Sequence, residues 1–504
     1  MGLFPGKEDL ELTEGGVAKP LFFLALPIVI TNLLQTAYNL ADTFWLGQYS
    51  NTALAAISFA FPMVFLFISL GLGISVAGSV LVAQNIGRGD ERQAEYAASQ
   101  TIVFALVASA ILGAVGFVVV EDLLTIFGAD PATLVEATKY MRVITLGLPA
   151  MFGFFIFVSL MRGYGDTVTP MLVMLVTVVL NVILDPFLIN GWMVFPELGI
   201  EGAAYATVFS RVVATVAGFG IMFSGRRGVQ IRLSDMRPDF EYLREILDIG
   251  VPASIEGVSR SLSVNLLLII VGSFATEVVS GYGIGVRVFS VIFLPAIAVA
   301  RGVETMAGQN IGAENPDRAE TAADVAARTT FTILGAIGIL VFFFPEPIIR
   351  IFTDPSNPGT EQVIATGAQF LRYVALTFGF IGVVRAYTGA FRGAGQTLVS
   401  AVIAITFLGL IRLPVAAGLA LGVGGEYTVP VLDATLSVPQ LVSPIGPAGI
   451  WWGFVVSNVV GALLALAWFK RGGWRDAEVR GTGPHSSDAD EMDADEVDAA
   501  AGDD

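Results

Sequence analysis

The sequence AQNIGRGDERQAE at residues 83–95 returns 225 residues later as GQNIGAENPDRAE at residues 308–320. The same shift carries Pro27 onto Pro252. A repeat at a fixed distance indicates that the chain contains two copies of one structural unit. Most of the remaining sequence therefore belongs to one copy or the other, and equivalent positions in the two copies can be compared.

The composition places both copies in a membrane. Of 504 residues, 55% are hydrophobic and 14% are charged, and the mean hydropathy is +0.75. The run at residues 101–120, TIVFALVASAILGAVGFVVV, has no charge and reaches the roughly 20 residues that cross a bilayer. The first 20 residues lack the pattern of a secretory signal peptide. The sequence predicts a polytopic helical membrane protein, in which paired copies enclose a cavity typical of transporters.

Several classes of function are excluded by what the sequence lacks. It has no cysteine, and its one histidine, His485, lies in a polar tail. We therefore expect no cofactor, no cysteine- or histidine-based metal site and no enzymatic centre. No nucleotide-binding G-x-x-x-x-G-K-[ST] sequence occurs. The net charge of −17 disfavours a nucleic-acid partner.

The predicted fold is an all-α polytopic membrane protein with twelve transmembrane helices in two pseudo-symmetric six-helix lobes around a central cavity. The helices are expected at residues 20–46, 54–83, 96–120, 136–161, 169–190, 200–223, 245–273, 280–308, 321–344, 361–390, 396–421 and 446–469. An even number of helices in each copy gives a parallel repeat. The expected domains are an N-terminal cytoplasmic segment (1–19), an N-lobe (20–223), a cytoplasmic linker (224–244), a C-lobe (245–470) and an acidic disordered tail (471–504).

The basic residues of the short loops fall on one predicted side of the membrane, which the positive-inside rule makes cytoplasmic. Both termini are then inside, in a multi-pass protein of the cell membrane that we expect to be a monomer. The sequence has 23 arginines and only 4 lysines. An acidic, lysine-poor surface fits a salty cytoplasm, so we predict a halophilic archaeon as the source.

Two carboxylates inside apolar helices are the leading candidates for chemistry. Asp42 lies in the first predicted helix and Asp185 in the fifth, with Asn181 one turn before Asp185. Thr207 and Tyr140 supply further oxygens. Such a set suits a proton or a hard cation such as Na⁺. The alternative is structural: the two aspartates cap helices, or pair with Arg142 and Arg211.

The second copy lacks these groups. The repeat aligns Asp42 with Leu267, Asp185 with Val415 and Thr207 with Phe454. Ion chemistry is therefore expected in the first copy alone. Glu256 and Arg260 of the second copy are candidates for the cavity, although their spacing of four equally fits a plain intrahelical ion pair.

Prolines and large apolar side chains complete the candidates. Pro27 and Pro252 occupy equivalent places in the leading helix of each copy, where a proline permits a bend, and we expect them to take part in gating. Further candidates for the cavity wall are Gln35, Met63, Phe154, Phe155 and Phe289.

These features together resemble the multidrug and toxic compound extrusion (MATE) family, nearer its DinF-like and archaeal branch. The resemblance covers residues 20–470 and is carried by Leu26-Pro27 with Gln35 and Asp42, both Gln-Asn-Ile-Gly segments, RGYGDT at 162–167, NVILDP at 181–186 and FRGAG at 391–395. Helix 361–390 departs from the NorM-like branch because it has no aspartate near its middle.

The resemblance implies two lobes forming a V-shaped cavity and export of small organic compounds, cationic or amphipathic, by antiport against H⁺ or Na⁺. It also implies a cation site, with Na⁺ possible, at Asp42, Asn181, Asp185 and Thr207, with Tyr140 nearby, and a functional role for Glu256. Two alternatives stay open: a flippase for lipid-linked precursors from the same superfamily, and a membrane enzyme or receptor.

Overall fold

The computed structural model describes residues 11–126, 130–429, 434–477, 479 and 480. Its helices in the first copy are α1 (Ala18–Tyr49), α2 (Asn51–Arg88), α3 (Glu91–Ile126), α4 (Pro131–Leu146), α5 (Leu148–Tyr164), α6 (Val168–Asn190) and α7 (Ile200–Ser224). The second copy contains α8 (Phe240–Gly272), α9 (Thr276–Ile292), α10 (Leu294–Gly312), α11 (Pro316–Phe343), α12 (Pro345–Arg350), α13 (Thr360–Ala375), α14 (Phe378–Gly393), α15 (Thr397–Ala404), a π-helical turn (Ile405–Arg412), α16 (Leu413–Leu421) and α17 (Ala448–Lys470).

Within the described residues, ten helices are long and apolar enough to cross a membrane, and the number reaches twelve if each bent pair is one span. The bent pairs are α4 with α5 and α13 with α14, and each bends by 54°. The breaks fall at Gly147 and Thr377, which the repeat aligns. The equal bends show that the copies share backbone geometry, and the predicted all-α polytopic fold is confirmed.

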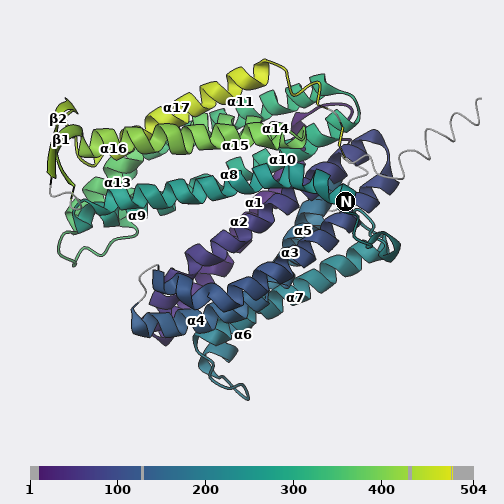
Figure 1. Cartoon of the computed structure of the whole chain (residues 1–504), viewed down its shortest axis with the longest axis horizontal. Coiled ribbons are helices and arrows are strands. Elements are labelled where there is room, and N and C mark those ends of the chain that lie inside the picture. The colour runs from purple at the N-terminus through teal and green to yellow at the C-terminus, as the bar shows by residue number, and fades with distance from the viewer. Residues whose placement is uncertain (1–10, 127–129, 430–433, 478, 481–504) are drawn as a thin grey trace, which may run out of the picture.

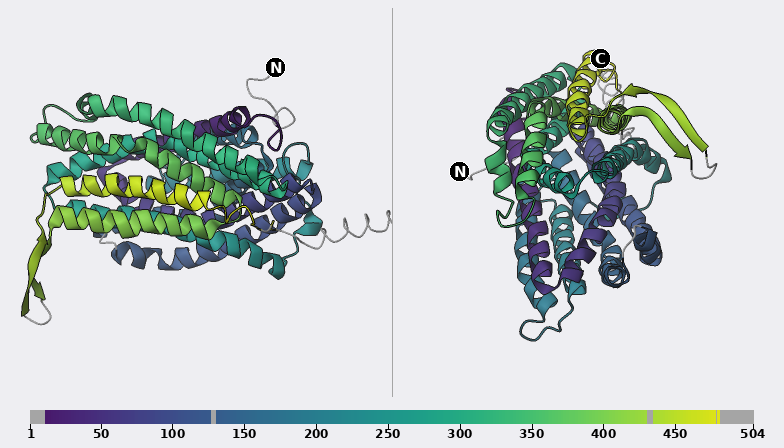
Figure 2. Two further views of the ribbon diagram at one scale, coloured as in Figure 1. Left: turned by 90° about the horizontal axis from the view of Figure 1, so that it is seen from above. Right: turned by 90° about the vertical axis from the view of Figure 1, so that its left-hand side faces the viewer.

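The helices form two groups that meet at one end of the molecule and diverge toward the other (Figure 1). We call the meeting end, where the described N-terminal segment lies, the closed end, and the opposite end the open end. The two further views show the same long, roughly parallel helices from above and from the open end (Figure 2). This arrangement fits the two predicted lobes.

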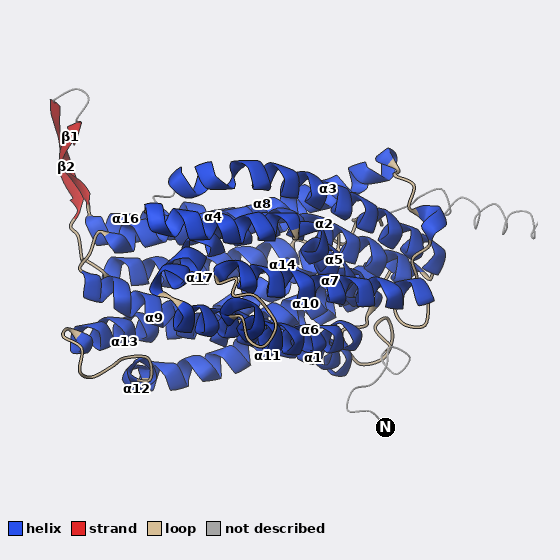
Figure 3. Cartoon of the chain, turned by 90° about the horizontal axis from the view of Figure 1, so that it is seen from below, coloured by secondary structure: helices blue, strands red, loops and turns tan. Residues whose placement is uncertain are grey.

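A β-hairpin at the open end was not predicted. Strands β1 (Val423–Val429) and β2 (Ala434–Val442) pair antiparallel, and they project beyond the helices (Figure 3). The helix pattern alone predicts only a connection between two helices at residues 422–445. The alternating, β-branched segment 435–442 is the signal in the sequence that points to a strand.

Two glutamines hold the lobes together at the closed end. The Gln84 side chain in α2 donates to the Gly393 carbonyl at 3.0 Å, and the Gln309 side chain in α10 donates to the Gly163 carbonyl at 3.0 Å. These two bonds are equivalent under the repeat, and we call the four residues the latch. The glutamines of the two Gln-Asn-Ile-Gly segments thus make reciprocal contacts between the lobes.

The latch depends on a close approach of α2 and α10. A methyl group on Gly87 would lie 1.9 Å from the Gln309 carbonyl oxygen, and one on Gly312 would lie 1.9 Å from that of Gln84. Only glycine lets the two backbones come this close.

The leading helix of each copy crosses between lobes. Leu21 and Leu24 near the start of α1 lie in a core with Val303 of α10 and Phe391 of α14, whereas Leu46 at its other end packs in an N-lobe core. The first copy therefore contributes the start of its first helix to the core of the second copy.

The same exchange occurs in α8. Ile246 and Ile249 pack in an N-lobe core with Val80 of α2, whereas Leu267 and Val271 pack in the C-lobe. The predicted boundaries at 20–223 and 245–470 follow the repeat, but the packed cores exchange the starts of α1 and α8.

The linker between copies is fixed to the N-lobe. Arg92 of α3 forms an ion pair with Asp235, and the Gln100 side chain donates to the Asp235 carbonyl at 2.7 Å. The Tyr96 hydroxyl donates to Asp239 at 2.6 Å, and this bond lowers the pKa of the Asp239 carboxyl.

The start of the predicted tail packs against the body. The Trp474 ring stacks on Phe469 with ring centres 4.6 Å apart, and the Arg480 N–H donates to the Gln84 side-chain oxygen at 2.9 Å. The predicted disorder of the tail can be compared only up to Arg480, and residues 481–504 lie outside the described part of the chain.

Candidate functional site

Asp42 of α1 and Asp185 of α6 lie together inside the N-lobe. Their side chains face each other closely enough to interact directly, and both are buried. Asn181, one turn before Asp185, donates from Nδ2 to Asp185 Oδ1 at 3.3 Å. The structure therefore brings together the two carboxylates and the amide that the sequence singled out.

Three oxygen atoms of this cluster have no hydrogen-bond donor. Asp42 Oδ1, Asp185 Oδ2 and Asn181 Oδ1 are buried without a partner among the described residues. A buried polar atom without a partner is costly, and a buried carboxylate more so. A proton or a cation bound by these oxygens would remove that cost, which is the expected property of an ion-coupling site.

Hydroxyl groups border the cluster. Thr207 of α7 neighbours Asp42, and the Tyr38 hydroxyl donates to Thr207 Oγ1 at 2.8 Å. Tyr140 of α4 lines the same cavity as Asp42. Tyr38 is not among the predicted site residues, although it lies one helical turn before Asp42 and this spacing places it on the same face.

Arg211 lies beside the cluster without pairing with either aspartate. It donates to Gln35 Oε1 at 2.8 Å and lies over the rings of Tyr38 and Phe154, 5.0 and 4.9 Å from their centres. Arg142 pairs with Glu121 at 3.0 Å near the open end. The alternative that these arginines pair with Asp42 and Asp185 does not match the structure.

A cavity of about 590 Å³ opens beside Asp42. It is lined by Gln35, Asp42, Tyr140, Phe155 and Thr207 of the N-lobe and by Arg287 of α9, so both lobes contribute. A second cavity of about 230 Å³ shares Gln35 and Phe155 with the first and continues toward the closed end. We name these the upper and the middle compartment.

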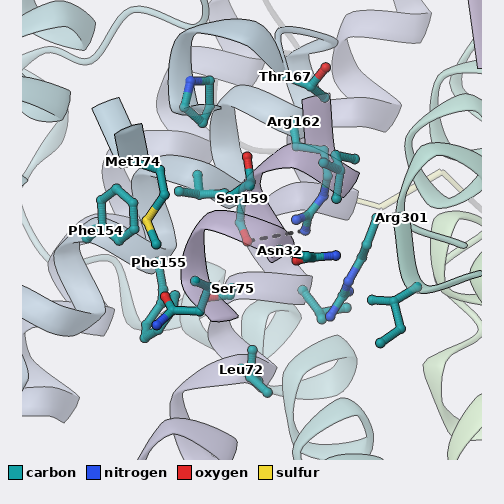
Figure 4. A pocket seen from close by; sticks show the side chains of 17 residues that line it. Asn32, Leu72, Ser75, Phe154, Phe155, Ser159, Arg162, Thr167, Met174 and Arg301 are labelled. Carbon is teal, nitrogen blue, oxygen red and sulfur yellow. Dashed lines mark hydrogen bonds between the residues drawn. The ribbon is translucent and has the colours of Figure 1, made fainter. Parts of the chain in front are cut away.

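Figure 4 shows the middle compartment. Phe154 and Met174 lie on one side, and Arg162, Asn32 and Arg301 lie on the other. Arg162 comes from α5 of the N-lobe and Arg301 from α10 of the C-lobe, so the middle compartment also lies between the lobes. Gln35, Phe154 and Phe155 all line this compartment.

Two other candidates for the cavity wall lie elsewhere. Met63 is buried in the N-lobe core with Phe67 and Met141. Phe289 packs on Phe293, Phe378 and other rings of the C-lobe core, 4.3 Å from the Phe293 ring centre. In the sequence, a large apolar residue that packs in a core looks the same as one that lines a cavity. Only the contacts in the structure distinguish the two.

Glu256 and Arg260 border a third, lower compartment of about 100 Å³, which Leu72 and Val76 of α2 also line, so that it too lies between the lobes. Arg260 pairs with Glu256 at 3.3 Å, and Arg392 of α14 pairs with Glu256 at 3.1 Å. The intrahelical pair therefore exists, but it is part of a larger cluster that sequence spacing did not reveal.

The two prolines lie inside unbroken helices, Pro27 in α1 and Pro252 in α8. The Thr31 hydroxyl donates to the Pro27 carbonyl at 2.8 Å. Pro27 lies between the part of α1 that packs in the C-lobe core and the part that carries Asp42. Pro252 lies beside the residues of α8 that pack in the N-lobe core. Both positions suit a bend between lobes.

No group of three or more histidine, cysteine, aspartate or glutamate side chains that could hold a metal ion occurs in the described parts of the chain. A bilobal membrane fold with a cavity between the lobes is typical of a secondary transporter. The MatE family model matches residues 27–187 and 252–417, and the chain belongs to the MATE family of multidrug efflux transporters.

Individual relatives agree with this membership. The chain is 29% identical to a probable multidrug resistance protein NorM from Thermotoga maritima, over 92% of this chain and 94% of that protein. It is 28% identical to a FAD transporter from Shewanella oneidensis, over 82% and 90%. The fold matches a MATE transporter solved in an outward-facing conformation with a TM-score of 0.82, 24% identity and coverage of 93% and 98%. The family membership confirms a multi-pass membrane transporter of small organic substrates that is not an enzyme.

Proposed function

We propose that the protein exports organic molecules by antiport against an inward flow of cations that bind between Asp42 and Asp185. The observation that carries the proposal is the set of three buried oxygens without donors on Asp42, Asp185 and Asn181. A proton or a small cation can satisfy acceptors that the described residues leave unpaired.

The site also touches the substrate route. Asp42 lines the upper compartment, where an exported molecule would lie. When the pair of carboxylates gains a cation, its charge changes, and with it the preferred packing of α1 against α6. A difference in interaction energy between two packings is what a ligand-driven switch requires. We assign Pro27 and Pro252 to the bends that follow.

We prefer H⁺ as the coupling ion, because only two of the candidate ligands, Asp42 and Asp185, are anionic. Na⁺ is the alternative, and the oxygen atoms of Thr207 and Tyr140 favour it. We place the closed end and both termini on the cytoplasmic side, as the basic loops predict. The DinF-like and archaeal branch, the halophilic source and the monomeric state remain predictions.

The test is transport by the purified full chain in proteoliposomes. Vesicles are loaded with ethidium, a cation, or with pyrenebutanoate, an anion, and dye movement is followed after imposing either a pH gradient at equal Na⁺ or a Na⁺ gradient at equal pH. Asp42→Asn and Asp185→Asn should each abolish gradient-driven movement, and Asp122→Asn, an exposed carboxylate at the end of α3, should not.

The two gradients decide between the ions. Transport driven by the pH gradient alone supports H⁺, and robust transport driven by Na⁺ at equal pH reverses this preference. Full activity in Asp42→Asn or in Asp185→Asn would contradict the proposed coupling site.

A further inference from the structure

The lower compartment has more positive than negative charge. Five arginines surround it and the adjoining wall of the middle compartment: Arg162, Arg260, Arg301, Arg385 and Arg392. Only two carboxylates, Glu256 and Glu304, pair with them. Three positive charges are therefore uncompensated within the described residues. Uncompensated charge at membrane depth is costly and marks a site of function.

The existing ion pairs show where the excess lies. Arg392 bridges both glutamates, 3.1 Å from Glu256 and 2.9 Å from Glu304, and Arg301 pairs with Glu304 at 2.9 Å. Arg385 of α14 has no carboxylate within ion-pair distance in the described part of the chain, although it lines the same compartment. Arg385 is the residue that a purely structural network would not need.

Unpaired donors face the same space. Arg162 Nε and Asn32 Nδ2 are buried without an acceptor among the described residues. Arg162 and Asn32 lie with Arg301 on one wall of the middle compartment (Figure 4). Donors without acceptors call for a ligand that only accepts hydrogen bonds, and a carboxylate or phosphate has that property.

The compartments adjoin one another. The middle and lower compartments share Leu72, Val76, Ile297 and Arg301 in their walls, and the middle and upper ones share Gln35 and Phe155. The upper compartment is lined largely by apolar side chains, Phe61, Val64, Phe65 and Ile68 among them. One molecule can therefore place an anionic group among the arginines and an apolar body toward the upper compartment.

We propose that Arg162, Arg260, Arg301 and Arg385 bind the carboxylate or phosphate group of the exported molecule, so that the substrate class is amphipathic organic anions. This inference adds a substrate class to the proposed function. It rests on the proposed function for the statement that the bound molecule is exported. It narrows the expectation of cationic or amphipathic substrates to amphipathic anions: a coupling cation binds in the N-lobe, and the substrate anion binds between the lobes, to three arginines of the C-lobe and to Arg162 of the N-lobe.

The test measures binding of three matched fluorescent probes to the purified full chain: pyrenebutanoate, its neutral amide, and the pyrenylbutyl trimethylammonium ion. We expect the wild type to bind the anion at least about tenfold more tightly than the amide, as charge-assisted hydrogen bonds provide. Arg385→Gln should remove most of this preference and leave amide binding unchanged, and Arg385→Lys should restore part of it. Arg328→Gln, an exposed arginine of α11, is the matched control and should bind like the wild type.

A lipid phosphate is the other source of such an anion. If dioctanoyl phosphatidylglycerol displaces pyrenebutanoate from the wild type, and does so more weakly in Arg385→Gln, the anion site is supported and a lipid is its ligand. The flippase alternative would then gain support. Displacement by free organic anions alone supports the site with a soluble substrate.

Equal affinity of the wild type for all three probes would overturn the inference, and this comparison needs no variant to fold. Anion preference unchanged in a folded Arg385→Gln protein would overturn it as well. Asp185→Asn, which alters no residue in the walls of the three compartments, separates the two proposals: it should still bind pyrenebutanoate while losing gradient-driven transport. If the wild type prefers the anionic probe but neither gradient drives its transport, only the proposed function is contradicted.

Discussion

The Asp42–Asp185 site of the N-lobe and the arginine cluster of the C-lobe lie on equivalent parts of a duplicated scaffold. The repeat aligns Gln35 with Arg260 and Phe155 with Arg385, and it aligns Asp42 with Leu267. The unpaired oxygens of the N-lobe site are acceptors on Asp42, Asp185 and Asn181, whereas five arginines around the lower compartment and its adjoining wall face two glutamates within the described residues. The difference teaches that the duplicated backbone provides the cavity, and a few side chains on it decide which charge each lobe binds.

Converting the N-lobe site to its C-lobe counterpart should have the largest effect. Asp185→Val introduces the residue found at the equivalent position, Val415, and removes one of the two anionic ligands. We expect coupled transport to fall to background, a loss of at least about 100-fold, as a site that depends on both carboxylates requires. Thermal stability should change little, because removal of the unpaired Asp185 Oδ2 is offset by the loss of the acceptor for Asn181 Nδ2.

Proteoliposome transport and thermal unfolding of the same preparation check this expectation. Val415→Thr is the matched control, since it alters the equivalent C-lobe position without touching the aspartates. Coupled transport that survives Asp185→Val would show that the lobes do not divide the charges as proposed.

The second-largest effect is expected at the latch, to which both copies contribute equally. Gly87→Ala places a methyl group 1.9 Å from the Gln309 carbonyl oxygen and forces α2 and α10 apart. The cost of such overpacking is about 1–3 kcal/mol, so the closed end should open in a population about 5–150-fold larger.

The chain has no cysteine, so single cysteines introduced at exposed positions of the two lobes can carry spin labels without background. Distances between labels across the closed end should lengthen in Gly87→Ala. Gly220→Ala in α7 is the control, because a methyl group there meets no atom within 4 Å. An unchanged distance distribution in Gly87→Ala would remove the latch from the mechanism.

A smaller effect is expected from the prolines. Pro27→Ala restores a backbone N–H in the segment of α1 that passes between lobes, which should stiffen it and slow transport several-fold while cation binding at Asp42 persists. Pro252→Ala tests the equivalent point of α8, which has Leu267 at the position equivalent to Asp42. Transport rates of both variants that equal the wild type would leave the prolines a structural role.

The smallest effect is expected at the C-terminus. A chain ending after Arg480 retains the bond from its backbone to Gln84 and should transport normally. A chain ending after Trp474 loses this hydrogen bond at the latch, the ion pairs of Arg475 with Asp317 and Glu320, and the ion pair of Arg480 with Asp248. Because each of these solvent-accessible contacts is worth about 1 kcal/mol or less, transport should differ from that of the longer chain by no more than several-fold. A large loss in the longer chain would show that residues 481–504 regulate transport.

The sequence predicted the helical membrane fold, because apolar runs of membrane length and an internal repeat are strong signals, but it did not predict the β-hairpin of β1 and β2. It identified Asp42, Asn181 and Asp185 because charged and amide groups are rare inside such runs. It did not distinguish Met63 and Phe289, which pack in cores, from Phe155, which lines the cavity. It also paired Glu256 with Arg260 alone, since the partner Arg392 is 136 residues away from Glu256.

The exchange of leading helices has a consequence for how the protein is made. When residue 224 leaves the ribosome, the N-lobe core still lacks Ile246, Ile249 and Ala253, which complete it. Conversely, the C-lobe core waits for Leu21 and Leu24, which have been in the membrane since the start of synthesis. Neither half can reach its final packing alone. The two copies must therefore consolidate together, as one cooperative step late in biogenesis, rather than as two domains folding in sequence.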